Sequence, residues 1–373
     1  MVLYFDHNAT SPLCAPAREA WLDATERFIG NPSSPHRLGA RAEAALEEAR
    51  AMLAGWLGCK ADEIVWTSGA TESVNTAIHH TARASEREAW VSAIEHPCVL
   101  SAAEHHFAGR LRTIPVNEQG VLDLAWLDAA LATSRPALIA VMAANNETGV
   151  LQPWREVLAL CKERGVPLLC DAAQWLGKMP AQGLGGCDFV SGCAHKFGGP
   201  QGVGFLKTAA RLKPLLFGGL QEGGRRAGTE NVAGILSMVA ALEAREAAMC
   251  QSLGAKQDLR PNFEREVRLQ VSGARIVGSG AERLWNTCTV IMPEVGDCRH
   301  RWVVKLDKLG FAVSTGSACA SGKEAPSHVL AAMGVSAADS SRVLRFSSGW
   351  ETTMSDWGAL LDGLVRAHGE MRG

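Results

Sequence analysis

The chain has 373 residues, of which 47% are hydrophobic and 20% are charged, a balance typical of a globular protein with one large core or two domains. Its 37 basic and 39 acidic residues give a formal net charge of −2 and form no long run of either sign. The charge distribution therefore predicts neither a nucleic-acid partner nor an anionic membrane, and small neutral or zwitterionic substrates fit better.

The beginning of the chain lacks the basic segment and the long apolar stretch of a signal peptide. The longest clean apolar run, residues 137–144, is far shorter than the roughly 20 residues that cross a bilayer. The eleven cysteines include no CxxC pair and no spacing typical of metal ligands. We therefore expect reduced thiols, a cytoplasmic location and no metal site. Four of these cysteines are predicted to be small buried hydrophobic residues: Cys161, Cys170, Cys250 and Cys288.

Short β-rich runs alternate with helical stretches from about residue 60 to 210. This alternation predicts an α/β fold with a mostly parallel sheet that helices cover on both faces. The strands are expected at residues 63–66, 89–93, 138–142, 166–169, 189–191 and 203–206.

Helices are expected at residues 37–57, 154–164 and 231–249. Apolar residues recur at helical spacing in the first of these, which places Glu43, Glu47 and Arg50 on its solvent face. After about residue 259 a second, smaller α/β unit is expected to begin.

Polar residues follow the predicted strands at the points where the strands end. In open α/β sheets the ligand binds at the carboxyl ends of the strands, so these residues predict one shared pocket. The clusters are Ser68–Glu72, Glu95–His96, Asn145–Glu147, Asp171–Gln174 and His195–Lys196.

Three of these polar residues suit an aldehyde cofactor with a phosphate group. Lys196 could form a Schiff base, although by itself it could equally be a surface lysine. Asp171 at a strand end could pair with a protonated pyridine nitrogen. Thr71 stands at an expected helix start, where a phosphate could bind, although a simple helix cap would have the same sequence.

The chain resembles the class V branch of fold-type I pyridoxal-phosphate enzymes, and within it the IscS/NifS-type cysteine desulfurases. The resemblance covers nearly the whole chain. The segments that match the family, in chain order, are Asp6–Thr10, Gly30–Ser34, Thr67–Ser73, Glu95–His96, Asn145–Gly149, Asp171–Gln174, His195–Lys196 and Ala227–Asn231.

The resemblance implies a large cofactor domain at residues 13–258 with a mostly parallel seven-stranded sheet. Residues 1–12 and 259–373 would form a smaller α/β domain. It also implies pyridoxal 5′-phosphate as the cofactor, which a Schiff base would join to Lys196. The remaining cofactor residues would be Ala70, Thr71 and His195 near the phosphate, His96, Asn146, Asp171 and Gln174 around the ring, and Thr229 from a neighbouring subunit of a homodimer.

Cys319 lies in a stretch of small residues that describes a loop carrying one thiol. The resemblance implies that this thiol accepts sulfur from L-cysteine as a persulfide and leaves alanine, with Lys196 and His96 as the other catalytic residues. A buried spectator cysteine is the alternative. Arg345, together with Asn146, would bind the substrate carboxylate, for which a planar guanidinium is suited, although Arg345 could instead form a surface salt bridge.

Three residues depart from the family pattern: Cys193 replaces a common serine near the phosphate, Gly223 replaces an arginine, and Trp350 replaces another arginine. These departures keep an inactive dimeric scaffold as an alternative. Selenocysteine lyase activity or another class V reaction is a further alternative, because Lys196, Asp171 and Thr71 would serve each of these reactions equally. A sulfur-acceptor protein, such as an iron–sulfur scaffold, is the expected partner, but the sequence does not identify the acceptor.

Overall fold

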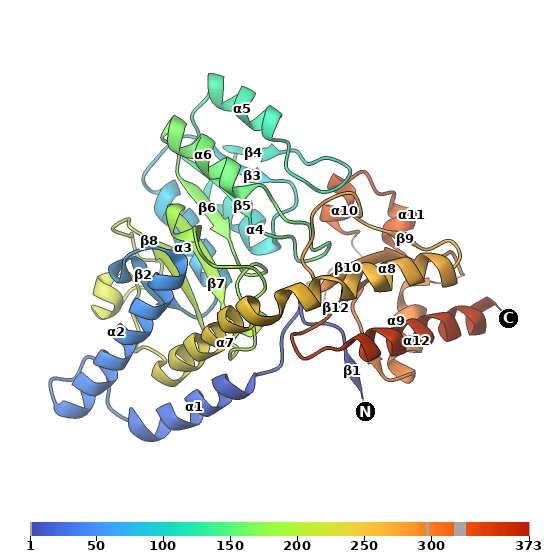
Figure 1. The fold of residues 1–373 in the computed structure, drawn as a ribbon. Helices are drawn as coiled ribbons and strands as arrows, with labels where there is room; N and C mark the ends of the chain where they lie inside the picture. Colours follow the sequence, from blue (N-terminus) through green and yellow to red (C-terminus); the bar gives the residue numbers. More distant parts are fainter. Residues whose placement is uncertain (1, 296–297, 317–325, 373) are drawn as a thin grey trace.

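A computed structural model describes residues 2–295, 298–316 and 326–372. Its largest element is a sheet of seven strands in the order β2-β8-β7-β6-β5-β3-β4 (Figure 1). Strand β8 is antiparallel to both β2 and β7, while the other neighbouring pairs are parallel. The strands are β2 (Ile64–Thr67), β3 (Ala89–Ser92), β4 (Leu111–Ile114), β5 (Leu138–Met142), β6 (Leu168–Asp171), β7 (Phe189–Cys193) and β8 (Gly204–Thr208).

Helices cover both faces of this sheet. Successive side chains along each strand point to opposite faces, so they enter two different cores. Trp90 and Ile139 pack into one core, whereas Val91 and Ala140 pack into the other. Buried residues of α2 (Arg37–Leu57), α5 (Leu124–Thr133), α6 (Trp154–Arg164) and α7 (Val232–Gln257) line the first core, together with Ala17 of α1 (Ala15–Arg27). The second core contains residues of α3 (Ala70–Ala82) and α4 (Pro97–His106).

A second, smaller α/β part surrounds the end of α7 (Figure 1). Its core joins Phe5 near the amino terminus to residues between Leu259 and Ala367. Its strands are β1 (Leu3–Tyr4), β9 (Arg275–Ile276), β10 (Thr287–Ile291), β11 (Phe311–Ala312) and β12 (Val343–Ser347), and its helices are α8 (Leu259–Gln270), α9 (Cys298–Lys308), α10 (His328–Ala332), α11 (Ala337–Ser340) and α12 (Met354–Arg372).

The structure confirms the predicted α/β class and the mostly parallel seven-stranded sheet. Helices α2 and α6 have the predicted bounds, and α7 continues to Gln257 rather than ending near residue 249. Strand β4 was missed because it is short and only partly buried, so its sequence shows little hydrophobic alternation. The domain limits at residues 12 and 258 stay a prediction.

Two predictions about individual side chains were wrong. Cys250 is exposed, whereas Cys161, Cys170 and Cys288 are buried as expected. Arg50 is only 6% exposed and does not lie on the solvent face of α2. Helical spacing could not reveal this, because the partner that buries the guanidinium lies far along the chain.

That partner is Glu222, whose two carboxylate oxygens accept hydrogen bonds of 2.9 and 3.0 Å from Arg50. Arg50 also donates to the carbonyl oxygen of Ile64 at 2.7 Å, and the backbone N–H of Trp66 donates to Glu222 at 2.9 Å. The ion pair therefore joins α2, strand β2 and the loop that follows Gly218. Hydrogen bonding to Glu222 raises the pKa of Arg50 against the opposing effect of burial.

Arg50→Ala should lower the free energy of unfolding by about 3–5 kcal/mol, because it leaves the buried Glu222 carboxylate without its partner. Urea denaturation at a fixed protein concentration measures the change. Arg27→Ala is the matched control, since it removes an exposed ion pair with Asp23 at 2.8 Å and should cost less than about 1 kcal/mol. Equal losses in the two variants would contradict a stabilising role of the buried pair.

Candidate active site

A cavity of about 890 Å³ lies at the carboxyl ends of the parallel strands. Segments that follow β3, β5, β6 and β7 contribute to its wall, as do the start of α3 and residues 8–10. This is the position at which open α/β sheets bind ligands. The sequence-predicted residues that line the cavity are Ala70, Thr71, His96, Asn146, Asp171, Gln174, His195, Lys196 and Arg345.

Lys196 lies just after β7, and its amine reaches back to the first residues of the chain. The Nζ atom donates to the carbonyl oxygens of Asn8 at 2.7 Å and Ala9 at 2.8 Å. Two backbone acceptors therefore hold the amine at the cavity wall. The sequence placed Lys196 in a pocket but gave no indication that the amino-terminal segment would fix its position.

Asp171 is the last residue of β6 and is only 5% exposed. Its Oδ1 atom accepts from the backbone N–H of Ala173 at 2.9 Å and from the hydroxyl of Ser191 at 3.1 Å. These donors fix the carboxylate without neutralising its charge. The arrangement suits a cationic ring nitrogen in the cavity, because a buried carboxylate needs an opposite charge.

The first turn of α3 lines another part of the cavity with Ala70 and Thr71. Gly69 precedes the helix with a φ of 155°, a backbone conformation that favours glycine. The backbone N–H groups and the dipole of a helix start make such a turn suitable for an anion. The wall of the cavity therefore includes a helix start suited to an anion as well as the carboxylate of Asp171.

Two further groups, Cys193 and His195, line the cavity. Burial, reinforced by the positive charges of Lys196 and Lys178, lowers the pKa of His195 to about 4, so its ring is neutral near pH 7. Burial raises the pKa of Cys193 to about 11, which keeps its thiol protonated. His195 and Cys193 therefore act here as neutral hydrogen-bonding groups.

His96 caps the amino terminus of α4, where its Nδ1 atom accepts from the backbone N–H of Cys98 at 3.2 Å. This bond leaves the ring proton on Nε2 and fixes the ring beside the cavity. Burial lowers the pKa of His96, and the negative charge of Asp171 opposes that shift. The ring is thus held as a neutral, flat group at the wall.

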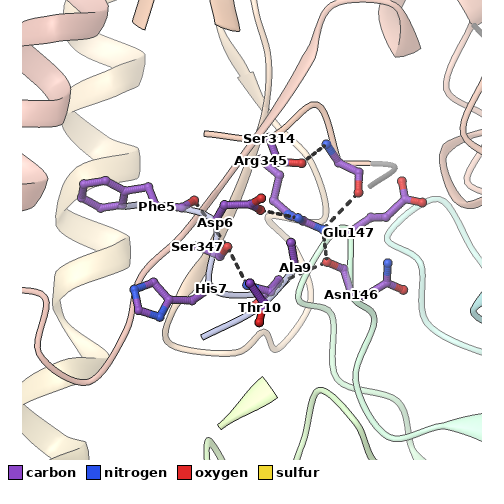
Figure 2. A network of polar contacts seen from close by, with 12 residues as sticks. Phe5, Asp6, His7, Ala9, Thr10, Asn146, Glu147, Ser314, Arg345 and Ser347 are labelled. Carbon is purple, nitrogen blue, oxygen red and sulfur yellow. Dashed lines mark hydrogen bonds and ion pairs between the residues drawn. The ribbon is translucent and has the colours of Figure 1, made fainter. Parts of the chain in front are cut away.

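Arg345 on β12 lines the cavity and lies at the centre of a polar network (Figure 2). Its guanidinium donates to Asp6 Oδ1 at 2.7 Å and to the carbonyl oxygens of Asn146 at 2.9 Å and Gly316 at 3.0 Å. The buried Nε atom has no partner among the described residues. Asp6 therefore already binds part of the Arg345 guanidinium, the group that was predicted to bind the substrate carboxylate.

Several residues at or beside the cavity had no role in the sequence prediction. Glu95 is fully buried, and burial together with the charge of Asp171 raises its pKa well above the ordinary value. Ser327 donates to Glu147 at 2.6 Å, and His328 Nε2 donates to the carbonyl oxygen of Glu95 at 2.8 Å. Glu95 and Glu147 stood in matched motifs, whereas no local signal marked Ser327 or His328.

The structure does not place two of the predicted residues in the cavity. Thr229 is exposed and does not line the cavity of its own chain. Cys319 falls within residues 317–325, outside the described part of the chain. The predicted roles of both residues therefore stay predictions.

Comparison with known protein families gives one match over most of the chain. The family of class V aminotransferases matches residues 3–360. A cysteine desulfurase IscS from Dictyoglomus turgidum is 37% identical, with 99% of this chain and 95% of the relative covered. A cysteine desulfurase from Klebsiella pneumoniae is 40% identical, with 92% of this chain and 87% of the relative covered.

Solved structures agree with these relatives. A NifS-like protein from Rickettsia africae superimposes with a TM-score of 0.89 at 28% identity, covering 99% of this chain and all of that structure. SspA, solved in complex with cysteine, gives a TM-score of 0.78 at 28% identity, with coverage of 92% and 98%. The match therefore extends over both α/β parts of the fold.

Proposed function

Since the chain belongs to the class V aminotransferase family, we propose that it is a cysteine desulfurase. It converts L-cysteine to L-alanine and transfers the sulfur to Cys319 as a persulfide. The observation that carries this proposal is one cavity that brings together Lys196, Asp171, His96 and the first turn of α3. Relatives at 37–40% identity that are cysteine desulfurases support the same activity.

The residues of the cavity fit pyridoxal phosphate, which supplies an electron-withdrawing ring when it is bound. The first turn of α3 offers backbone donors for the phosphate, and Asp171 offers a buried carboxylate for the ring nitrogen. Asn146 Oδ1 is buried and has no partner among the described residues, so it leaves an acceptor for a ligand group. Lys196 would hold the cofactor covalently, and the flat ring of His96 would stack on it.

The same residues would move the protons of the reaction. Lys196 Nζ would also act as the base that removes the α-proton of the substrate. The carbonyl oxygens of Asn8 and Ala9 keep this amine at the wall of the cavity. Arg345 would orient the substrate carboxylate through its remaining Nε donor or by exchanging one of its present contacts. The thiolate of Cys319 would attack the substrate sulfur and form a sulfur–sulfur bond, while the bond between that sulfur and the β-carbon breaks. The electron pair of the broken bond would stay with the carbon side, which takes up a proton and leaves as alanine, so no external oxidant or reductant is needed.

Other activities of the family remain alternatives, namely selenocysteine lyase activity or another class V reaction, because Lys196, Asp171 and Thr71 would serve each of them. An inactive scaffold is also an alternative, since Cys193, Gly223 and Trp350 depart from the family pattern. The complete set of Lys196, Asp171 and His96 around one cavity favours an active enzyme.

Within the described residues, no helix is long and apolar enough to cross a membrane. We place the enzyme in the cytoplasm, where thiols stay reduced, and cell fractionation tests this location. The persulfide would pass to an acceptor protein for iron–sulfur cluster or thio-cofactor biosynthesis. Transfer of radiolabelled sulfur from the enzyme to an added scaffold protein would measure that step.

Lys196→Ala should abolish alanine production and the visible absorption of the protein reconstituted with pyridoxal phosphate, because no other residue stands in its place as attachment point and base. Borohydride reduction of the wild type should fix the cofactor on the peptide that contains Lys196. Lys207→Ala is the control, since this buried lysine contacts Cys187 and Glu63 away from the cavity. Alanine production by Lys196→Ala at the wild-type rate would overturn the assignment.

Cys319→Ala should still bind pyridoxal phosphate and L-cysteine, yet alanine and persulfide should fall to background because no thiol accepts the sulfur. Mass spectrometry should find one extra sulfur on the wild-type peptide that contains Cys319, and none on the peptide of Cys193. Cys250→Ala removes an exposed thiol instead and should keep full activity. If Cys319→Ala makes alanine at the wild-type rate, the lyase alternative replaces the desulfurase.

The protein should be a homodimer in which Thr229 completes the partner's site. Thr229 is exposed in the single chain, and nearby Phe217 and Leu220 are 83% and 87% exposed. Large apolar side chains at such exposure are typical of a surface that another protein covers. Leu220→Asp should shift sedimentation towards the monomer and lower activity, whereas Leu269→Asp, at a 72% exposed site on α8, should change neither. A fully active wild-type monomer would contradict the shared site.

A further inference from the structure

Lys178 is a buried lysine close to the cavity, and it lies in the turn that follows β6. Its side chain is only 4% exposed, and within the described residues no carboxylate forms an ion pair with it. Burial, reinforced by the positive charges of Lys196 and Arg345, lowers its pKa well below the ordinary value. Burying a lysine without a counter-charge is costly, so its contacts require an explanation.

Those contacts are the side-chain oxygens of two amides. The Nζ atom donates to Gln174 Oε1 and, at 3.1 Å, to Asn8 Oδ1. Gln174 lines the cavity, and the carbonyl oxygen of Asn8 is the acceptor that holds Lys196. Lys178 therefore touches two residues that contact the catalytic centre, while its own side chain stays outside the lining of the cavity.

The backbone acceptors around these amides fix which end is oxygen and which is nitrogen. Gln174 Nε2 donates to the carbonyl oxygen of Asn8 at 2.9 Å, and Asn8 Nδ2 donates to the carbonyl oxygen of Asn146 at 3.2 Å. A carbonyl oxygen can only accept, so nitrogen must lie on that side of each amide. The opposite end of each amide is then oxygen, to which Lys178 can donate whether its amine is charged or neutral.

We propose that Lys178 is a positioning residue that occupies the amide oxygen of Gln174, so that this amide presents only N–H to the ring oxygen of the cofactor. Gln174 has two N–H donors, and one is taken by the carbonyl oxygen of Asn8. The second remains for a ligand in the cavity. This inference rests on the proposed cofactor, because it assigns the direction of the hydrogen bond between Gln174 and that group.

Trp350, one of the departures from the family pattern, supports the same turn. Its indole N–H donates to the carbonyl oxygen of Gly177 at 2.7 Å, and Trp285 donates to the carbonyl oxygen of Lys178 at 3.1 Å. The two rings lie against each other with centroids 4.9 Å apart. This tryptophan pair fixes the backbone from which Lys178 reaches Gln174 and Asn8.

The test is the pH at which the visible absorption of the cofactor on Lys196 changes. The group that titrates is the nitrogen that links the cofactor to Lys196, whose proton is shared with the ring oxygen. A hydrogen bond donated to the ring oxygen stabilises the negative charge on that oxygen, and it therefore favours the form in which the linking nitrogen has lost its proton. Lys178→Met removes the donor to the amide oxygen of Gln174, so this amide should hold its second N–H less firmly on the ring oxygen. The midpoint should therefore move to higher pH by about half to one unit, as expected for one hydrogen bond. Gln174→Ala should give a similar shift.

The loss of a nearby cation would by itself also raise the midpoint pH of the absorption change. The double variant with Lys178→Met and Gln174→Ala separates this direct effect of charge from an effect of Lys178 on the position of Gln174. If Lys178 acts through Gln174, Lys178→Met adds no shift to Gln174→Ala. An equal shift in both backgrounds, or no shift from either single variant, would overturn the inference. Asp171, Lys196 and Arg345 are unchanged in all of these proteins.

Two more variants complete the design. Lys207→Met makes the same chemical change at a 4% exposed lysine away from the cavity and should leave the midpoint unchanged. Trp350→Phe keeps a ring but loses the bond to Gly177, and it should move the midpoint upwards by less than Lys178→Met does; no movement would count against the inference even if Lys178→Met does not fold. A wild-type protein without the visible band would instead contradict the proposed function.

Discussion

The hydrogen bonds of Asn8 hold the two parts of the molecule together at the cavity. Its carbonyl oxygen accepts from Lys196 and Gln174, which follow strands of the large sheet. Its side chain donates to Thr287 on β10 at 2.9 Å and to the carbonyl oxygen of Asn146. Asn8 is 1% exposed, so these bonds are shielded from water and a missing partner would be costly. The position of the Lys196 amine therefore depends on a residue from the first turn of the chain.

The wall of the cavity near this junction contains groups of opposite polarity. The first turn of α3 offers the partial positive charge of a helix start, and Asp171 offers a carboxylate. His195 has a pKa of about 4 and His96 a lowered pKa, so neither ring adds a cation at neutral pH. A ligand with an anionic phosphate and a cationic ring nitrogen matches these two groups, and the amine of Lys196 lies on the wall of the same cavity.

The departures from the family pattern have different structural consequences. Gly223 adopts a φ of 63°, beside Glu222 at 51°, so a glycine relieves strain in a turn that the ion pair with Arg50 holds in place. Cys193 brings a protonated thiol, a weaker donor than a hydroxyl, to the wall of the cavity. Trp350 adds a partly buried hydrogen bond to the turn that carries Lys178. None of these changes removes a charged group from the cavity.

The sequence alone predicted the alternating sheet and helices, because buried parallel strands and amphipathic helices have local periodicity. It also predicted Lys196, Asp171, Thr71 and His96 as neighbours, because the carboxyl ends of parallel strands meet at one edge. Only the tertiary structure revealed that Glu222 buries Arg50, that Asp6 binds Arg345, and that Lys178 contacts Asn8. Each of these pairs lies more than 150 residues apart in the chain. No local pattern encodes such contacts, since they depend on how separate elements pack.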